Sequence, residues 1–472
     1  LPGNSASGEY EVANSLRFDG ASSAYLSKTF GSSGNRKTFT VSFWVKKCEL
    51  ATNPDTMSDA QMLFGGQQDS YPAFNIIFLH TNDTIFLKDA QASNNIQISI
   101  KSDFKFRDPA AWYHVVFAID TTQSTASNRA KLYINGVQQT DLAGENATGG
   151  ASDDPLYPDQ NQDLQFNSNT AHYINKYASN YEDMYMAEFV FVDGQQLDAT
   201  SFGEFDSDSN IWKPKDVSGL TFGTNGFYLD FEDSSSLGND AAGSNNWTTN
   251  NITATDQSTD TCTNNFVTWN PLDNARSYSG SIDLSEGNLR QSNSNDASLI
   301  STIALNSGKW YMEFKCEDAD NTRTFGIIDI AESNGYVGHS SVASAVSYGY
   351  KSSDGTLWIG TSQQASSVGT TSAGDIVSMA IDLDSSTKTI KWQKNGSDLS
   401  GTTQLTISHS TSDYYFGIIC RCDGGQIISA NFGSPAYSIS SGNSDANGYG
   451  NFEYAVPSGY YALNTKNLAE YG

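Results

Sequence analysis

One pattern occurs twice in the chain, and it constrains the fold more than any other feature. Residues 112–139 read WYHVVFAIDTTQSTASNRAKLYINGVQQ, and residues 375–399 read DIVSMAIDLDSSTKTIKWQKNGSDL. Each stretch has an apolar run that ends in Ala-Ile-Asp, a Ser/Thr-rich connection, and an alternating run that ends in Asn-Gly. Asn-Gly supplies the two positive-φ residues of a tight type I′ turn. Each stretch is therefore predicted to be a two-strand unit, and the repetition predicts two copies of one architecture.

Strand-sized runs continue on both sides of the repeated pattern. TFTVSFWVKK, at 38–47, places Phe39, Val41 and Phe43 on one face of a strand. In WYHVVFAID both faces are largely apolar, which is typical of an inner strand. One short helical candidate stands at 197–205, where Asp198 or Thr200 could cap a single turn. Strands at this spacing, without a lasting helical period, favour β-sandwiches.

The length requires more than one core. Single hydrophobic cores stop growing at roughly 250–300 residues, and this chain has 472. We predict an all-β protein with two antiparallel β-sandwiches, an irregular connector and a C-terminal extension. The expected boundaries are an arm at 1–14, a first sandwich at 15–205, a connector at 206–275 packed on it, a second sandwich at 276–435 and an extension at 436–472.

Charge and cysteine content limit the partners. The formal net charge is −27, from 53 acidic and 26 basic residues, so nucleic acid and anionic membranes are disfavoured. No run approaches the 18 or so apolar residues of a membrane span, so no membrane insertion is expected. The five cysteines are odd in number and include no C-x-x-C, which predicts buried thiols rather than a disulfide framework.

Two domain families resemble parts of this chain. SLRFDGASSAYL, FTVSFWVKK, WYHVVFAID with KLYINGVQ, and MAEFVFVDGQQLDATSF resemble the laminin-G/pentraxin-like branch of the concanavalin A-like sandwiches. GKWYMEF, TFGIID, YGYKSSDGTLWIG, DIVSMAIDLDSSTKTIKWQKNG and IISANFG resemble a SPRY domain. SPRY domains are also concanavalin A-like in the wider sense. The resemblance implies that the repeated pattern marks the same hairpin in two related jelly-roll sandwiches.

A third resemblance concerns the source of the chain. FVDGQQLDATSFGEFDSDSNIWKPK, SNNWTTNNITATDQSTDT, NPLD and GYYALNTKNLAE resemble large structural proteins of marine tailed bacteriophages, where this pairing of domains occurs in tail fibres and appendages. The resemblance implies a virion location, contacts with other virion proteins and a homo-oligomer, since such assemblies are symmetric.

Catalytic patterns are not evident in the sequence. Glycosidases of this superfamily carry E-x-D-x-x-E on a strand, and the nearest match, Glu204, Asp206 and Asp208, has Ser209 at the third carboxylate position. No G-x-S-x-G occurs, and the five histidines show no zinc spacing. We expect a protein that is not an enzyme, with no catalytic residues. A glycan-degrading depolymerase is the enzymatic alternative.

Calcium is the cation that the laminin-G resemblance implies. It suggests Asp19, in the turn of SLRFDGAS, and Glu188, on the closing strand, as acidic ligands. Hard cations favour such oxygen ligands. Ala187 stands where many relatives have Asp, which departs from the pattern. In the competing interpretation Asp19 only forms the turn and no cofactor is bound.

Glycan binding is the other function that the resemblance implies. Lectin sites combine aromatic platforms with short polar side chains on rim loops, and the candidates are Tyr71, Trp212, Trp247 and Tyr336. Aromatic side chains in loops are also often packed beneath them. The expected function is a virion structural protein, in a tail fibre, appendage or capsid surface, that attaches to host-surface glycan. A capsid decoration protein without receptor binding is the structural alternative.

Overall fold

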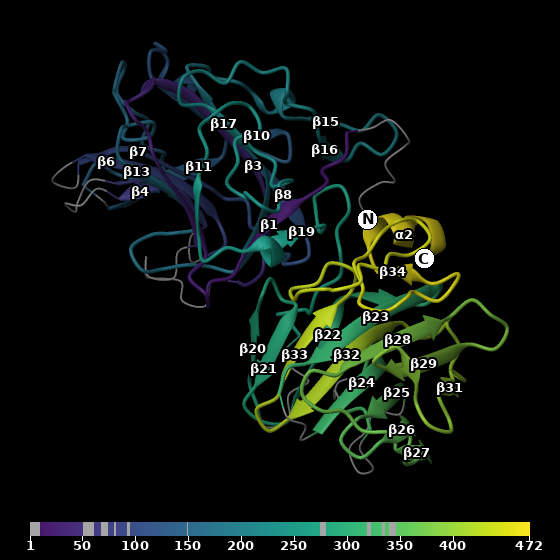
Figure 1. Cartoon of the computed structure of the whole chain (residues 1–472). Coiled ribbons are helices and arrows are strands. Elements are labelled where there is room, and N and C mark those ends of the chain that lie inside the picture. The colour runs from purple at the N-terminus through teal and green to yellow at the C-terminus, as the bar shows by residue number, and fades with distance from the viewer. Residues whose placement is uncertain are drawn as a thin grey trace. The chain divides into compact units, whose positions relative to one another are not determined.

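The computed structural model describes two compact units, Ser5–Thr263 and Asn264–Gly472, coloured from purple to teal and from teal to yellow in Figure 1. Each unit is built almost entirely of antiparallel strands, which confirms the predicted all-β class. In the described residues no helix is long and apolar enough to cross a membrane. The described ranges are 10–50, 61–67, 74–79, 82–91, 95–148, 150–273, 280–318, 322–332, 336–338 and 346–472.

Two large sheets form the sandwich of the first unit, beside a separate two-stranded sheet of β15 (Gly203–Phe205) and β16 (Trp212–Pro214). In the described residues the first sheet has the order β10-β9-β8-β3-β14-β1-β19, with β17 also paired to β14, and the second has the order β12-β11-β7-β6-β5-β4-β13-β2-β18. The strands of the first sheet are β1 (Ser15–Phe18), β3 (Thr38–Lys47), β8 (Trp112–Asp120), β9 (Ala130–Ile134), β10 (Val137–Gln139), β14 (Met184–Asp193), β17 (Phe227–Leu229) and β19 (Gln257–Ser258). Those of the second are β2 (Tyr25–Thr29), β4 (Gln61–Gln67), β5 (Phe74–Leu79), β6 (Ile85–Gln91), β7 (Asn95–Ser102), β11 (Leu142–Glu145), β12 (Ala151–Ser152), β13 (Ala171–Ile174) and β18 (Thr248–Asn250).

The core of the first unit lies between its two sheets. Phe39, Val41 and Phe43 of β3 are fully buried there, as their alternation predicted, and pack with Phe64 and Ile77 of the second sheet. The opposite face of β3 is also covered, because Trp44 belongs to a separate buried cluster with Trp212 and Val217. Side chains between Ala199 and Tyr228 thus cover part of the outer face of the first sheet, and Val116 and Ala118 of β8 belong to the same cluster, which explains why both faces of β8 are apolar.

Two sheets also form the second unit. In the described residues the first of these sheets has the order β20-β21-β33-β23-β28-β29-β30, with β31 also paired to β29 and β34 to β23. The second has the order β22-β32-β24-β25-β26-β27. The strands of the first are β20 (Ile282–Ser285), β21 (Arg290–Asn293), β23 (Lys309–Cys316), β28 (Ile376–Asp382), β29 (Thr389–Lys394), β30 (Ser397–Asp398), β31 (Gln404–Thr406), β33 (Ile427–Asn431) and β34 (Tyr461–Ala462). Those of the second are β22 (Ala297–Leu305), β24 (Thr322–Asp329), β25 (Ser347–Lys351), β26 (Thr356–Ile359), β27 (Ser362–Ala365) and β32 (Phe416–Asp423).

The repeated sequence pattern occupies the same place in both units. In each, it forms three consecutive strands at one end of a sheet: β8, β9 and β10 in the first, and β28, β29 and β30 in the second. Asn135 and Asn395 have φ of 47° and 49°, and the glycines that follow have 79° and 72°. Asn135 Oδ1 accepts a hydrogen bond from the His114 amide at 2.8 Å, and Asn395 Oδ1 accepts one from the Ile376 amide at 2.9 Å. The same turn chemistry therefore produces the same hairpin twice.

The C-terminal segment is more ordered than its sequence suggested. β34 pairs in parallel with β23, and Phe452 packs edge-on against Tyr311 at 5.0 Å. A short helix, α2 (Thr465–Tyr471), follows, with Asn464 capping it by accepting a hydrogen bond from the Asn467 amide. The sequence analysis did not predict this helix, because two turns are too few to show a 3.6-residue period. A 3₁₀ turn at Ala199–Ser201 is capped by Asp198, as expected.

Candidate functional site

Asp19 lies in the turn after β1 and belongs to a group of carboxyls at the rim of the first sandwich. Its Oδ2 accepts a hydrogen bond from the Ser22 amide at 2.9 Å. Burial, followed by the negative charges of Asp19 and Glu49, raises the pKa of the neighbouring Asp183 to about 8. Burial and Glu49 raise the pKa of Glu182 to about 9. Mutual repulsion of this kind is what a bound cation would relieve.

Glu188 occupies a different part of β14. It has φ of 51° at an irregularity in the pairing of β14 with β3, and its side chain accepts hydrogen bonds from Tyr10 at 2.8 Å and Tyr228 at 2.8 Å. Burial raises the pKa of Glu188 to about 7, and the two tyrosine hydroxyls oppose that shift. It follows Asp183 by five positions, roughly 16 Å along a strand. The structure therefore does not bring Asp19 and Glu188 together as ligands of one cation.

The rim carboxyls fit calcium only in part. Their oxygen donors are of the type that Ca²⁺ takes, but six to eight ligands are needed around it. Among the residues that the structure describes, no group of three or more His, Cys, Asp or Glu side chains is arranged to hold a metal ion. Calcium binding by Asp19 and Glu188 stays a prediction of the resemblance, and the carboxyl that the structure places beside Asp19 is that of Asp183.

Three of the four aromatic candidates are buried. Trp212 is 8% exposed, and its Nε1 donates a hydrogen bond to His114 Nδ1 at 3.0 Å. Trp247 is 4% exposed and packs edge-on against Phe227 at 5.0 Å in the main core. Tyr336, at 5%, lies with its ring 5.0 Å from the Arg421 guanidinium. These rings serve packing and do not form an exposed platform. Tyr71, the fourth, lies outside the described residues.

Glu204 and Asp206, which came nearest to the E-x-D-x-x-E pattern of glycosidases, stabilise a hairpin. Glu204 lies on β15 (Gly203–Phe205), which pairs with β16 (Trp212–Pro214). Lys213 Nζ is 3.2 Å from Asp206 Oδ2 and 3.7 Å from Glu204 Oε1. Asp206 also accepts hydrogen bonds from the Ser209 amide and hydroxyl, each at 2.8 Å, and these bonds lower its pKa. The arrangement accounts for these acids as turn and ion-pair residues.

An open groove lies on the outer face of the second sheet. It has a volume of about 530 Å³ and lies where β2, β13 and β18 run side by side. Tyrosine rings, ammonium groups, hydroxyls and an amide line it, which is the combination that recognises a polar ligand with flat apolar faces. The lining residues are Tyr25, Ser27, Lys28, Thr29, Ala171, Tyr173, Lys176, Asn246 and Thr248.

The tyrosines of this groove surround a lysine. Lys176 Nζ lies 4.2 Å from the ring centroid of Tyr25, 5.0 Å from that of Tyr173 and 6.0 Å from that of Tyr181. Tyr25 packs against Tyr173 at 6.1 Å and against Tyr181 at 5.7 Å. Cation–π contacts of this kind fix both the rings and the ammonium group. Lys28 Nζ donates a hydrogen bond to the Asn246 carbonyl oxygen at 3.0 Å on the same groove.

Sequence reasoning missed this groove because its residues are far apart in the chain. Tyr25 and Tyr173 meet only because β13 pairs with β2, in the register Tyr173↔Ser27. Asn246 arrives with β18, which pairs with the other edge of β2. The one usable signal was local: YINKYASNY at 173–181 places three tyrosines and a lysine within nine residues.

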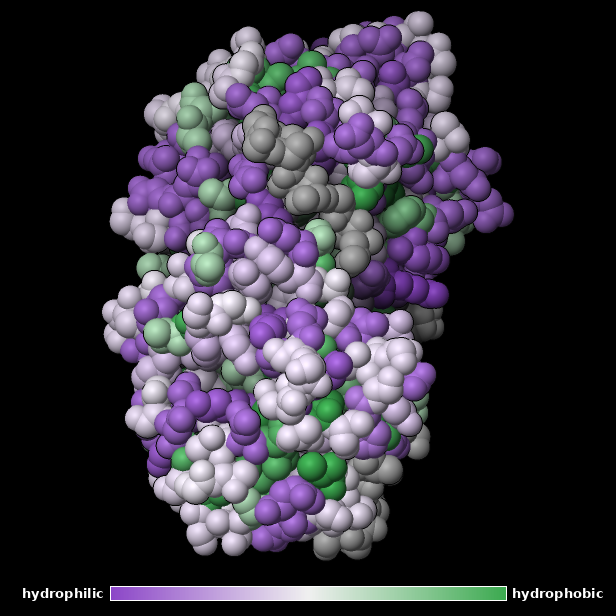
Figure 2. All heavy atoms as spheres, turned by 90° about the vertical axis from the view of Figure 1, so that its right-hand side faces the viewer, coloured by the Kyte–Doolittle hydropathy of each residue, from purple (hydrophilic) through white to green (hydrophobic). Residues whose placement is uncertain are grey.

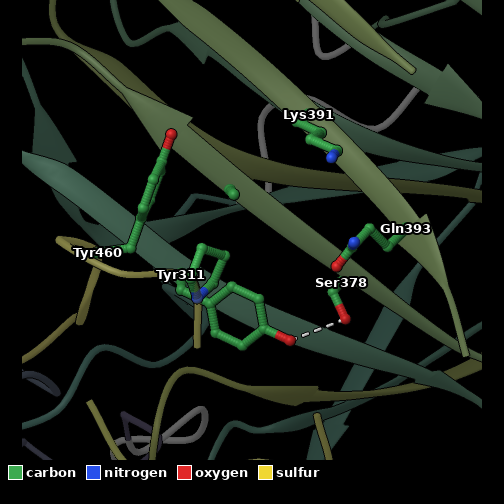
Figure 3. A pocket seen from close by; sticks show the side chains of 7 residues that line it. Tyr311, Ser378, Lys391, Gln393 and Tyr460 are labelled. Atoms are coloured by element: carbon green, nitrogen blue, oxygen red, sulfur yellow. Dashed lines mark hydrogen bonds between the residues drawn. The ribbon is translucent and has the colours of Figure 1, made fainter. Parts of the chain in front are cut away.

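A smaller cavity of about 220 Å³ lies in the second unit, between β23, β28 and β29 and the C-terminal segment. Figure 3 shows Tyr460 on the left, Gln393 and Ser378 on the right, and Tyr311 below them with its hydroxyl directed toward Ser378. Tyr311 donates a hydrogen bond to Ser378 at 2.9 Å. The cation that lines this cavity is Lys391, and its Nζ forms an ion pair with Asp398 Oδ1 at 2.7 Å. This cavity therefore offers less unpaired polarity than the groove of the first unit.

Large hydrophobic side chains are exposed at five of the described positions. Figure 2 shows a face on which hydrophilic residues predominate, with hydrophobic ones gathered in one area near its lower end. In the described residues the large hydrophobic side chains that are exposed lie apart in the sequence: Val137, Phe205, Leu272, Ile330 and Tyr415. Of these, Ile330 and Tyr415 are neighbours in space, because the Ile330 amide donates a hydrogen bond to the Tyr415 carbonyl oxygen at 2.9 Å.

Comparison with known proteins supports the fold of the first unit. Residues 19–172 match the family described as the concanavalin A-like lectin/glucanases superfamily. The similarity to this superfamily is therefore limited to residues 19–172 of the first unit. The match covers β2 but ends within β13, so Tyr173 and Lys176 of the groove lie outside it. A search of curated proteins by sequence found no match.

The solved structures to which the chain shows similarity include SPRY domains and a pentraxin. The SPRY domain of human HERC1 has 10% identity and a TM-score of 0.28, covering 34% of this chain and 96% of that one. The TRIM65 PSpry domain has 12% identity and a TM-score of 0.28, covering 35% and 89%. The native heptameric SAP-like pentraxin from Limulus polyphemus has 12% identity and a TM-score of 0.26, covering 40% and 79%.

Proposed function

We propose that this protein is a non-enzymatic structural component of a tailed-bacteriophage particle, in a tail fibre, an appendage or the capsid surface, that attaches to host-surface glycan. The observation that carries the attachment role is the groove with Tyr25, Tyr173 and Lys176 on a lectin-like sandwich. The particle assignment rests on the resemblance of the connector and C-terminal segments to marine phage structural proteins. Other virion proteins and further copies of this chain are the proposed partners.

The groove suits a sugar because it offers two kinds of contact at once. Half-buried tyrosine rings pack against the apolar face of a pyranose, while hydroxyl and amide groups at the edge exchange hydrogen bonds with its hydroxyls. Ser27 and Thr248 supply hydroxyls, and Asn246 supplies an amide. Single sites of this size bind weakly, so a symmetric oligomer would strengthen attachment by roughly 10²–10⁴ through avidity.

A binding assay on host polysaccharide tests the attachment role. We expect the full chain to bind immobilised host-surface glycan, and Tyr173→Ala to weaken binding at least tenfold because it removes one ring of the groove. Tyr415→Ala is the matched control, since this tyrosine is 48% exposed and lies in the other unit. Absence of binding to any host glycan would refute attachment. Release of new reducing ends would instead indicate the depolymerase.

The particle assignment has its own test. Antibodies against the purified chain should label intact phage particles in negative-stain micrographs, at a tail, an appendage or the capsid surface. Purified particles that lack the chain by mass spectrometry would refute this assignment without affecting the glycan result.

A further inference from the structure

The groove differs in charge from the chain around it. The chain carries 53 acidic and 26 basic residues, yet the described residues that line the groove include two lysines and no acid. The groove lysines, Lys28 and Lys176, are half-buried, whereas the fully buried lysines of the first unit are paired with carboxylates: Lys46 with Asp260, Lys47 with Asp83 and Lys88 with Glu145. The lining residues thus carry two positive charges and no negative one, although the charge of Asp240 acts on Lys28 from outside the lining, and a ligand that brings negative charge suits such a groove.

Lys176 is held in position without a carboxylate. In the part of the chain that the structure describes, its recorded contacts are with the three tyrosine rings. Lys28 donates to a neutral carbonyl oxygen, and burial lowers its pKa while the charge of Asp240 opposes that shift. Asp240 is itself occupied, because its side chain accepts hydrogen bonds from the amides of Tyr228, Ala242 and Asn245.

We propose that the groove binds an acidic polysaccharide, with a carboxylate or sulfate group on Lys176 and Lys28 and the sugar ring on Tyr25 and Tyr173. This inference rests on the proposed glycan attachment and names the class of glycan. Charge-assisted hydrogen bonds are roughly twice as strong as neutral ones, so the acidic group would contribute most of the discrimination. The net negative charge does not prevent this, because the Debye length is about 10 Å at 0.1 M salt.

Three polymers of similar length separate the possibilities: neutral dextran, dextran sulfate and polygalacturonate. We expect the full chain to bind at least one acidic polymer ten or more times more tightly than dextran, and more weakly at 0.5 M than at 0.1 M NaCl. Binding to dextran sulfate alone assigns sulfate, and binding to polygalacturonate alone assigns carboxylate. Either result supports the inference.

Matched variants assign the effect to the groove. Lys176→Met keeps an unbranched apolar stem among the tyrosines and removes the charge, so acidic-polymer binding should fall about tenfold while the melting temperature stays near that of the parent. Lys176→Arg should retain binding. Lys105→Met is the control, because Lys105 is exposed, lies in the same unit and also donates to a backbone carbonyl, at 3.1 Å.

Opposite results identify which claim fails. Equal binding of dextran and the acidic polymers, or an equal loss in the Lys105 and Lys176 variants, overturns the acidic-ligand inference and leaves glycan attachment standing. Failure to bind these polymers and every host glycan removes the attachment function itself.

Discussion

The strongest test of how the first unit is held together concerns Lys46 and Asp260. Lys46, on β3, places its Nζ 2.7 Å from Asp260 Oδ2, and the two side chains are 1% and 2% exposed. Trp112 Nε1 donates to the other carboxylate oxygen at 3.0 Å. Asp260 belongs to the segment that follows the sandwich strands, so the pair fixes that segment on the outer face of the first sheet.

Lys46→Met removes the cation and leaves the Asp260 carboxylate buried. Among the contacts given above, the Trp112 indole is then the remaining donor that stabilises its charge. Breaking a buried pair in this way costs about 3–5 kcal/mol. The Lys46 ammonium also lies 5.6 Å from the Tyr185 ring centroid, which adds about 0.5–1 kcal/mol. The double variant Lys46→Met with Asp260→Leu should recover most of the loss, since a hydrophobic pair of similar volume is often neutral.

Urea unfolding of the full chain, followed by tryptophan fluorescence, measures these differences. Lys394→Met is the control: Lys394 Nζ is 3.7 Å from Asp375 Oδ2, and its side chain is 37% exposed, so the cost should stay below about 1 kcal/mol. A loss below about 1 kcal/mol for Lys46→Met, or no recovery in the double variant, would refute the reasoning.

Three further predictions follow from buried acids and from one glycine. The folded-state pKa values of Glu182, about 9, and Asp183, about 8, lie above their ordinary values near 4. The folded state therefore holds more protons than the unfolded state between these limits, and its stability falls as pH rises. Melting temperatures should be higher at pH 5.5 than at pH 8.5, and Glu182→Gln should reduce the dependence of the melting temperature on pH. At pH 8.5, millimolar CaCl₂ should raise the melting temperature, EDTA should reverse the rise and Asp19→Asn should abolish it; no response would exclude calcium at this rim. Gly136→Ala should destabilise by about 2 kcal/mol or more in urea unfolding, because φ is +79° and the new Cβ would stand 2.2 Å from the Trp212 ring. Gly374→Ala, with φ of +86° and open space around it, should cost only about 1 kcal/mol; equal losses would contradict the steric argument.

The sequence by itself determined the local structure of this protein. Alternation with period two assigned Phe39, Val41 and Phe43 to one buried face, and Asn-Gly at 135–136 and 395–396 specified two equivalent turns. These features depend on neighbours within a few residues, so they can be read from the chain directly.

Only the tertiary structure decided which surfaces are covered and which are free. Trp212 and Trp247 looked like rim aromatics, but the segment that carries them folds back onto the sandwich and buries both. The groove exists because strands from three distant parts of the chain pair around β2. Strand order is set by packing between whole sheets, and no local pattern encodes it, so the juxtaposition of Tyr25, Tyr173 and Asn246 appears only in the folded chain.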